Sequence, residues 1–105
     1  MTLIEKALFL DHSAHYIRAL EINENTLSLT VYPCMRTDVC SHARFDNVRA
    51  LHIQDMEPDE PHELPWDIIG FDSKQLTNGY WKFVLYTGDL EYSFESLWPV
   101  ITKAE

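Results

Sequence analysis

Histidine and cysteine, the side chains that most often bind metals, form two groups in the first half of the chain. The groups are Asp11, His12 and His15, and Cys34, Cys40 and His42. On a helix, the three-residue spacing in the first group would put both imidazoles on one face, beside a carboxylate. Zinc sites, however, usually contain closely spaced pairs such as Cys-x₂-Cys, and the chain has none. We therefore expect no metal site and no cofactor.

Nucleophilic catalysis is a second chemistry that these residue types allow. A thiolate from Cys34 or Cys40 would need a histidine beside it in a cleft, and five histidines make such a pairing unspecific. The sequence lacks the motifs of hydrolase nucleophiles and zinc proteases. Its three glycines are too few to form a glycine-rich phosphate cradle. We expect no enzymatic activity; a hydrolase using cysteine and histidine or carboxylates is the third hypothesis for function.

Carboxylates gather in a proline-rich stretch, residues 55–67, called the acidic segment below. Three prolines within residues 55–65 prevent it from continuing a helix or a central strand. It also lacks the regular ligand spacing and central glycine of an EF-hand calcium loop. Two interpretations remain: a solvated surface loop, or an edge that docks a basic partner, with an aromatic anchor beside the acids. The residues expected to bind the partner are Asp55, Glu57, Asp59, Glu60, Glu63, Trp66 and Asp67.

Charge is distributed unevenly along the sequence. The 105 residues carry 17 acidic and 8 basic side chains, a net charge of −9. Residues 1–52 contain six acids and five bases, whereas residues 53–105 contain eleven acids and three bases, a net charge of −8. A field of this kind steers cationic partners at long range. Contacts with phosphates require Lys and Arg. The net negative charge therefore argues against nucleic acid and anionic membranes as partners.

Aromatic residues are concentrated in the second half. Four of them lie within residues 80–86: Tyr80, Trp81, Phe83 and Tyr86. Their spacing fits burial on both faces of a strand better than a nucleic-acid stacking platform, which needs a positive groove. The alternative to a protein-interaction role is a small-molecule binding domain with a concave, aromatic-lined sheet. The side chains that could line its pocket are Tyr80, Trp81, Tyr92 and Trp98.

A short helix is predicted at the N-terminus. Thr2 and Glu5 have the spacing of a capping box, and Leu3, Ala7 and Leu10 can share one face of this helix. The periodicity then changes from that of a helix to that of strands. Asp11, His12 and His15 fall at this boundary, which weakens the case for two imidazoles on one helical face.

Strands and turns account for the rest of the sequence. Alternating or β-branched and aromatic runs predict strands over residues 15–22, 27–32, 42–45, 48–54, 68–76, 80–87 and 90–95. Asn78-Gly79 is a strong signal for a type I′ hairpin turn, since both of its central residues need positive φ. Residues 97–101 are expected to close the chain as a packed end.

The predicted elements fit one domain, residues 1–105, that is mainly β. Consecutive hairpins favour an antiparallel sandwich or a curved half-barrel of about six or seven strands, with a short N-terminal helix. The start of the chain has only four consecutive apolar residues, Ala7 to Leu10, fewer than a secretory signal core requires. No run reaches the length of a membrane-spanning helix. We therefore expect a soluble, cytoplasmic protein with reduced cysteines.

The first half resembles small bacterial β-rich immunity proteins of polymorphic-toxin systems, and related small domains of unknown function. The matching stretches are His12-Ser13-Ala14, Ala19-Leu20-Glu21-Ile22, Leu27-Ser28-Leu29-Thr30-Val31 and Phe45-Asp46-Asn47-Val48. Ser13 stands where that pattern has Asp. The resemblance covers about half of the chain, consists mostly of strand patterning, and implies a non-catalytic inhibitor of a co-encoded toxin.

Charge, motifs and resemblance lead to one expectation for function. The chain is expected to be a non-catalytic protein-interaction domain, of the immunity type, that inhibits a basic toxin. The acidic segment would be its docking edge. Exposed strand edges could also pair two copies into a homodimer.

Overall fold

The computed structural model of the chain describes residues 1–55, 66–88 and 90–104. These residues form one helix and eight strands, so the mainly β class is confirmed, with eight strands in place of the six or seven expected. The elements are α1 (Leu3–Leu8), β1 (His15–Asn23), β2 (Thr26–Pro33), β3 (Cys40–Phe45), β4 (Arg49–Asp55), β5 (Trp66–Gln75), β6 (Tyr80–Thr87), β7 (Leu90–Leu97) and β8 (Val100–Ala104).

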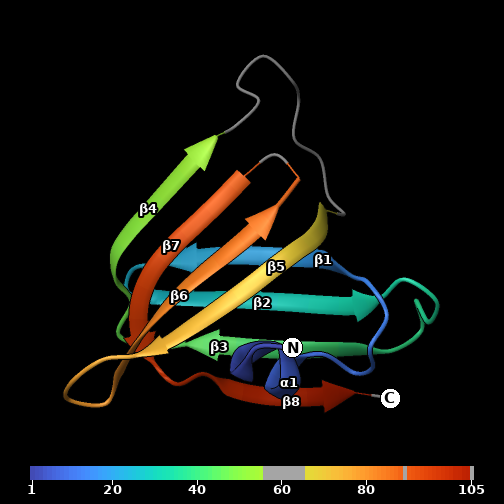
Figure 1. The fold of residues 1–105 in the computed structure, drawn as a ribbon, viewed down its shortest axis with the longest axis horizontal. Helices are drawn as coiled ribbons and strands as arrows, with labels where there is room; N and C mark the ends of the chain where they lie inside the picture. Colours follow the sequence, from blue (N-terminus) through green and yellow to red (C-terminus); the bar gives the residue numbers. More distant parts are fainter. Residues whose placement is uncertain (56–65, 89, 105) are drawn as a thin grey trace.

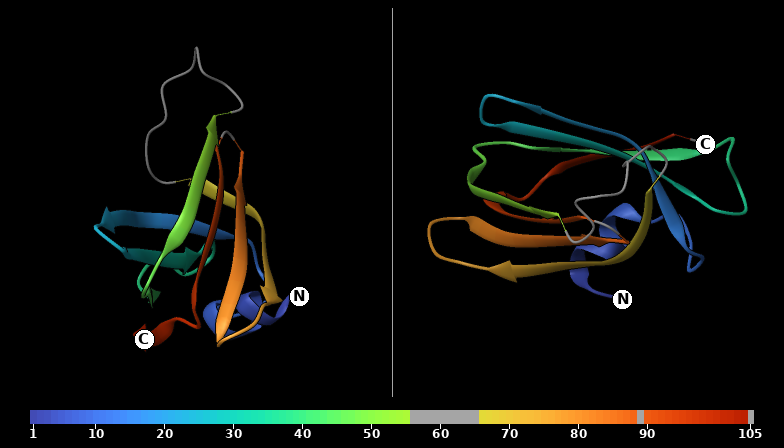
Figure 2. Two further views of the ribbon diagram at one scale, coloured as in Figure 1. Left: turned by 90° about the vertical axis from the view of Figure 1, so that its left-hand side faces the viewer. Right: turned by 90° about the horizontal axis from the view of Figure 1, so that it is seen from above.

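All eight strands belong to one antiparallel sheet with the order β4-β7-β6-β5-β1-β2-β3-β8. The sheet folds over on itself, so that β4, β7, β6 and β5 form one layer and the remaining strands form the other (Figures 1 and 2). Only two residue pairs join β5 to β1 between the layers. Within the described residues, β4 and β8 do not pair, and the sheet stays open, as a sandwich or half-barrel does.

The predicted capping box is present at the start of α1. Thr2 Oγ1 accepts a hydrogen bond from the Glu5 backbone N–H at 3.3 Å, and Glu5 Oε1 accepts one from the Thr2 N–H at 2.9 Å. The buried face differs from the expected one, because Ile4 and Leu8 are fully buried while Leu3 is 54% exposed. The Thr2 hydroxyl also donates a hydrogen bond to the Phe71 carbonyl, which attaches the start of α1 to β5.

Turn chemistry places the hairpins where the sequence predicts them. Asn78 and Gly79 have φ values of 61° and 78°, as a type I′ turn between β5 and β6 requires. At the β1–β2 turn, Glu24 adopts a φ of 55°. These two turns need only local residues, so the β1–β2 and β5–β6 pairs form between neighbours in sequence.

The end of the chain forms a strand in place of the predicted packed end. Strand β8 begins at Val100, after the Trp98-Pro99 break, and pairs with β3 through contacts such as Ala43↔Ile101. This strand accounts for the difference in strand count. Its partner lies far away in the sequence, and five residues are too few for alternation alone to reveal a strand.

Four phenylalanines form the centre of the core between the layers. Phe45 of β3 packs edge-on against Phe83 of β6 and Phe94 of β7, with ring centroids 5.0 and 5.1 Å apart. Phe71 of β5 completes the cluster, and all four side chains are buried. The rings therefore join β3 to the opposite layer, which it does not touch through the hydrogen-bonded ladder. Among the described residues, no helix has both the length and the apolar character needed to cross a membrane.

Candidate functional site

The acidic segment is attached at both ends to one end of the β4–β5 layer. Strand β4 finishes there at Asp55, whose partner across the ladder is Leu90, the first residue of β7. Ile68, near the start of β5, pairs with Thr87, the last residue of β6. The two flanks of the segment and the β6–β7 turn therefore lie at the same end of the layer (Figure 1). We call this part of the molecule the acidic end.

The structure locates three of the seven residues predicted to bind a partner. Asp55 and Asp67 are both exposed, at the end of β4 and near the start of β5. The backbone of Trp66 pairs with Ile17 of β1, and that of Asp67 with Tyr16. Residues Glu57, Asp59, Glu60 and Glu63 lie outside the described residues.

Contacts of Thr87, Leu90 and Gly88 link the ends of β6, β7 and β5 at the acidic end. Thr87 Oγ1 accepts a hydrogen bond from the Leu90 N–H at 2.9 Å and donates one to the Leu90 carbonyl at 2.8 Å. A Cβ placed on Gly88 would lie 3.2 Å from Asp67 Oδ1, so the absence of a side chain lets this carboxylate approach the turn. The Asp67 carboxylate therefore lies close to Gly88, at the same end of the layer as Asp55.

Strand β4 lies at the margin of its layer. Its sequence predicts a strand but indicates no functional role. All seven of its residues are exposed, and within the described part of the chain β7 is its one strand neighbour (Figure 1). Ile53, opposite the buried Tyr92, is 46% exposed, and Leu51 is 37% exposed. Strand order decides which strand lies at a margin, so alternation within residues 48–54 could not have revealed it.

Side-chain contacts attach the start of β4 to β7 and β6. Arg49 Nε lies 3.0 Å from Glu95 Oε1 of β7, and the guanidinium group lies 3.7 Å from the centre of the Tyr80 ring of β6. A register shift between Arg49 and His52, with Ala50 at a φ of 53°, marks a bulge after this contact. Beyond the bulge the ladder with β7 is regular from His52 to Asp55.

His15, one of the histidines considered as a metal ligand, has structural contacts. His15 is buried, its Nε2 accepts the Leu10 N–H at 3.1 Å, and its Nδ1–H donates to the Ser13 carbonyl at 2.9 Å. Its ring stacks on Phe9 with centroids 4.2 Å apart. Both nitrogens are therefore used to fix the connection between α1 and β1. Among the described residues, no group of three or more His, Cys, Asp or Glu side chains is arranged to hold a metal.

The cysteines are both free thiols and half-buried. Cys34 follows β2, where its N–H donates to the Ala14 carbonyl at 2.8 Å, and Cys40 begins β3. The nearby His42 contacts the Thr30 hydroxyl through Nδ1 at 3.0 Å, on the exposed face of the β2–β3 pair. This imidazole is thus held by a neighbouring strand.

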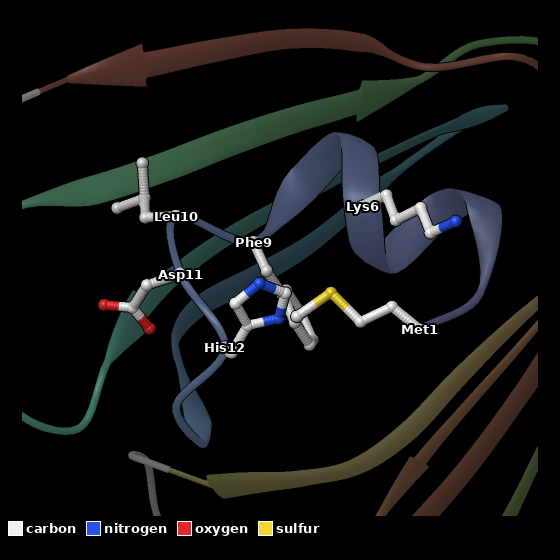
Figure 3. Close-up of a pocket in the computed structure, with 6 residues that line it drawn as sticks. All are labelled: Met1, Lys6, Phe9, Leu10, Asp11 and His12. Carbon is white, nitrogen blue, oxygen red and sulfur yellow. The ribbon is translucent and has the colours of Figure 1, made fainter.

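A shallow cleft of about 180 Å³ lies beside α1 and the start of the α1–β1 connection (Figure 3). Its lining residues are Met1, Lys6, Phe9, Leu10, Asp11 and His12. Hydrogen bonds from the Ser13 side chain and backbone lower the pKa of Asp11 below its ordinary value, because both donors favour the charged carboxylate. The carboxylate therefore closes a local turn with Ser13, while its charge stays beside the cleft.

The four aromatic residues of the small-molecule hypothesis do not line one concavity. Trp81 and Trp98 pack edge-on against each other with ring centroids 4.7 Å apart, and both pack against the core. Tyr92 is buried on the inner face of β7. Tyr80 lies on the opposite face of the layer, under Arg49. The inner-face rings therefore fill space between the layers.

Comparison of the chain with known proteins found no relative. No protein-family model, curated protein or solved structure matches the chain.

Proposed function

We propose that this chain is a non-catalytic protein-interaction domain that binds a basic protein partner through its acidic end. The observation that supports the proposal most directly is the convergence of Asp55 and Asp67 at one end of the β4–β5 layer. Asp55 and Asp67 are the first and last residues of the acidic segment, so both of its flanks lie at this end of the layer. A concentrated negative charge of this kind raises the rate at which a cationic protein is encountered.

The finer role that we propose is that of an immunity-type inhibitor, whose partner is a basic toxin. The uneven charge supports this role, since residues 53–105 carry a net charge of −8. The histidine and cysteine contacts are consistent with it: both His15 nitrogens bond to the backbone, a structural use of that side chain. A gene for a secreted basic toxin beside the gene for this chain would identify the partner.

Charge reversal at the acidic segment tests the proposal. The partner is first isolated from the source cells by affinity capture and identified by mass spectrometry. The variant Glu57→Lys, Asp59→Lys, Glu60→Lys should then associate with it about tenfold or more slowly at low salt, and its association rate should depend less on ionic strength. Stopped-flow mixing over a range of salt concentrations measures both effects.

A matched variant separates local charge from total charge. Glu21→Lys, Glu24→Lys, Asp38→Lys makes the same change in net charge at exposed positions of β1, the β1–β2 turn and the loop before β3. This control should slow association much less, because screened charges act over about 8–10 Å. Equal rates for the wild type and the acidic-segment variant would contradict the proposal.

A further inference from the structure

The outer edge of β4 has the properties of a strand that can accept another strand. It lies at the end of the strand order and is exposed along its whole length. Natural sheets usually protect such edges with Lys, Pro or a bulge. The bulge of β4 protects only its start, and residues 51–55 contain neither Lys nor Pro. Among the described residues, no second strand pairs with the outer edge of β4 at residues 51–54.

The other margin of the sheet, β8, is different. Its Lys103 lies across from Ser41 of β3, and Lys103 Nζ lies 3.4 Å from the Phe9 carbonyl. Lysine is the residue type that most often blunts an edge strand. The two margins are thus unequal, and β4 is the one open to pairing among the described strands.

Side chains on β4 indicate what an added strand would contain. Leu51 and Ile53 project from the inner side of the layer, next to the buried Tyr92, and both are partly exposed. Alternate residues of an added strand would place apolar groups against them. On the outer side the adjacent positions are His52 and Gln54, which accept polar neighbours.

Charge distinguishes between the kinds of strand that could pair with the outer edge of β4. Gln54 lies opposite Glu91 of β7, so an outward side chain of an added strand would be about 10 Å from that carboxylate, two strand spacings away. A second copy of the chain would carry the same net charge of −9, so the two copies would repel each other. A basic strand meets attraction instead.

We propose that β4 binds an extended basic segment of the partner protein as an added antiparallel or parallel strand, with alternate apolar side chains over Leu51 and Ile53. This inference rests on the proposed function and specifies how the partner is held. Main-chain hydrogen bonds supply affinity in this mode, and the alternate side chains supply specificity.

Synthetic peptides test the edge directly on the wild-type chain. The probe is acetyl-Lys-Val-Lys-Val-Lys-Val-Lys-amide, followed by amide chemical shifts of the ¹⁵N-labelled protein. We expect shifts concentrated in residues 51–55 and in β7. A peptide of the same sequence with alternate backbone nitrogens methylated keeps the charge but loses donors, and should bind about tenfold more weakly. The Glu analogue of the probe should bind more weakly still.

Neutral substitutions test the apolar contacts without changing the charge. Ile53→Asn should weaken binding of the lysine peptide about fivefold or more, because it removes apolar contact area. Val100→Asn is the matched control: Val100 is 51% exposed and lies on the opposite margin, so its replacement should leave binding unchanged. The methylated peptide keeps the test valid if Ile53→Asn lowers stability.

Each contrary outcome has a separate meaning. Equal binding of the methylated and unmethylated peptides would overturn strand addition, while a salt-dependent loss in the Glu57, Asp59, Glu60 variant would leave the proposed function standing. A wild-type dimer in sedimentation that Ile53→Asn dissociates would assign the edge to a second copy and overturn the basic occupant. Absence of peptide binding, or shifts confined to β8, would overturn the inference as well.

Discussion

Individual side chains in this protein fix connections that the ladder of strands does not make. His15 joins the end of α1 to the start of β1 by bonding to Leu10 and Ser13, and it stacks on Phe9. At the other layer, Tyr92 is buried on the inner face beside Ile53. Tyr92 is thus an ionisable group inside the fold, and its protonation is linked to the free energy of unfolding.

Tyr92 supplies a prediction for alkaline pH. Burial raises the pKa of Tyr92 above its ordinary value of 10.0, because the charged phenolate is poorly solvated inside the fold. The unfolded chain therefore releases this proton at a lower pH than the folded chain. The resulting stability is fully present below about pH 10 and is lost as the pH rises through the folded-state pKa.

Urea unfolding between about pH 8 and 11.5 measures this effect. Tyr92→Phe removes the ionisable hydroxyl and should flatten part of the alkaline fall in the free energy of unfolding. Tyr86→Phe is the control, because Tyr86 lies on the exposed face of β6. An identical alkaline slope for Tyr92→Phe and the wild type would show that this phenol does not contribute.

At the scale of elements, a helix of six residues cannot be stable by itself. Helix α1 depends on its capping box and on the bond from the Thr2 hydroxyl to the Phe71 carbonyl of β5. One side chain thus caps the helix and also attaches it to the sheet. The strands, by contrast, are held by ladders and by turns whose residues suit the required backbone angles.

Replacing Thr2 tests this double role. Thr2→Ala should lower the free energy of unfolding by about 1–2 kcal/mol, through loss of the cap and of the bond to β5. Thr2→Ser keeps a hydroxyl at the same position and should retain most of that stability. Thermal or urea unfolding compares the variants, and equal losses for Ala and Ser would argue against the hydroxyl as the cause.

At the scale of the whole molecule, a short backbone ladder and the ring contacts of Phe45 join the two layers among the described residues. Two residue pairs connect β1 to β5, whereas Phe45 of β3 reaches Phe83 and Phe94 in the other layer. The phenylalanine cluster therefore determines how the layers face each other. The orientation of the layers in turn leaves β4 and β8 at separate margins.

Phe45→Ala is expected to be the most damaging of these substitutions, with a loss of about 3–5 kcal/mol in the free energy of unfolding. Phe45→Leu keeps much of the apolar volume and should cost less. Chemical denaturation followed by tryptophan fluorescence measures both. A loss below about 1 kcal/mol for Phe45→Ala would mean that the layers are held together mainly by other contacts.

Sequence alone determined the features that depend on neighbouring residues. The capping box at Thr2 and the type I′ turn at Asn78-Gly79 follow from local chemistry, as do the hairpin pairs. The Asp55 and Trp66 flanks of the acidic segment were also recognisable, since proline and charge mark the segment by composition.

Only the tertiary structure decided the features that depend on distant residues. The pairing of β8 with β3, the meeting of Asp55 and Asp67 at one end, and the open edge of β4 all follow from strand order. Alternation states which side of a strand is apolar, but it does not state which strand lies beside it. That choice depends on aromatic packing across the core, where Phe45 meets rings brought from the other layer.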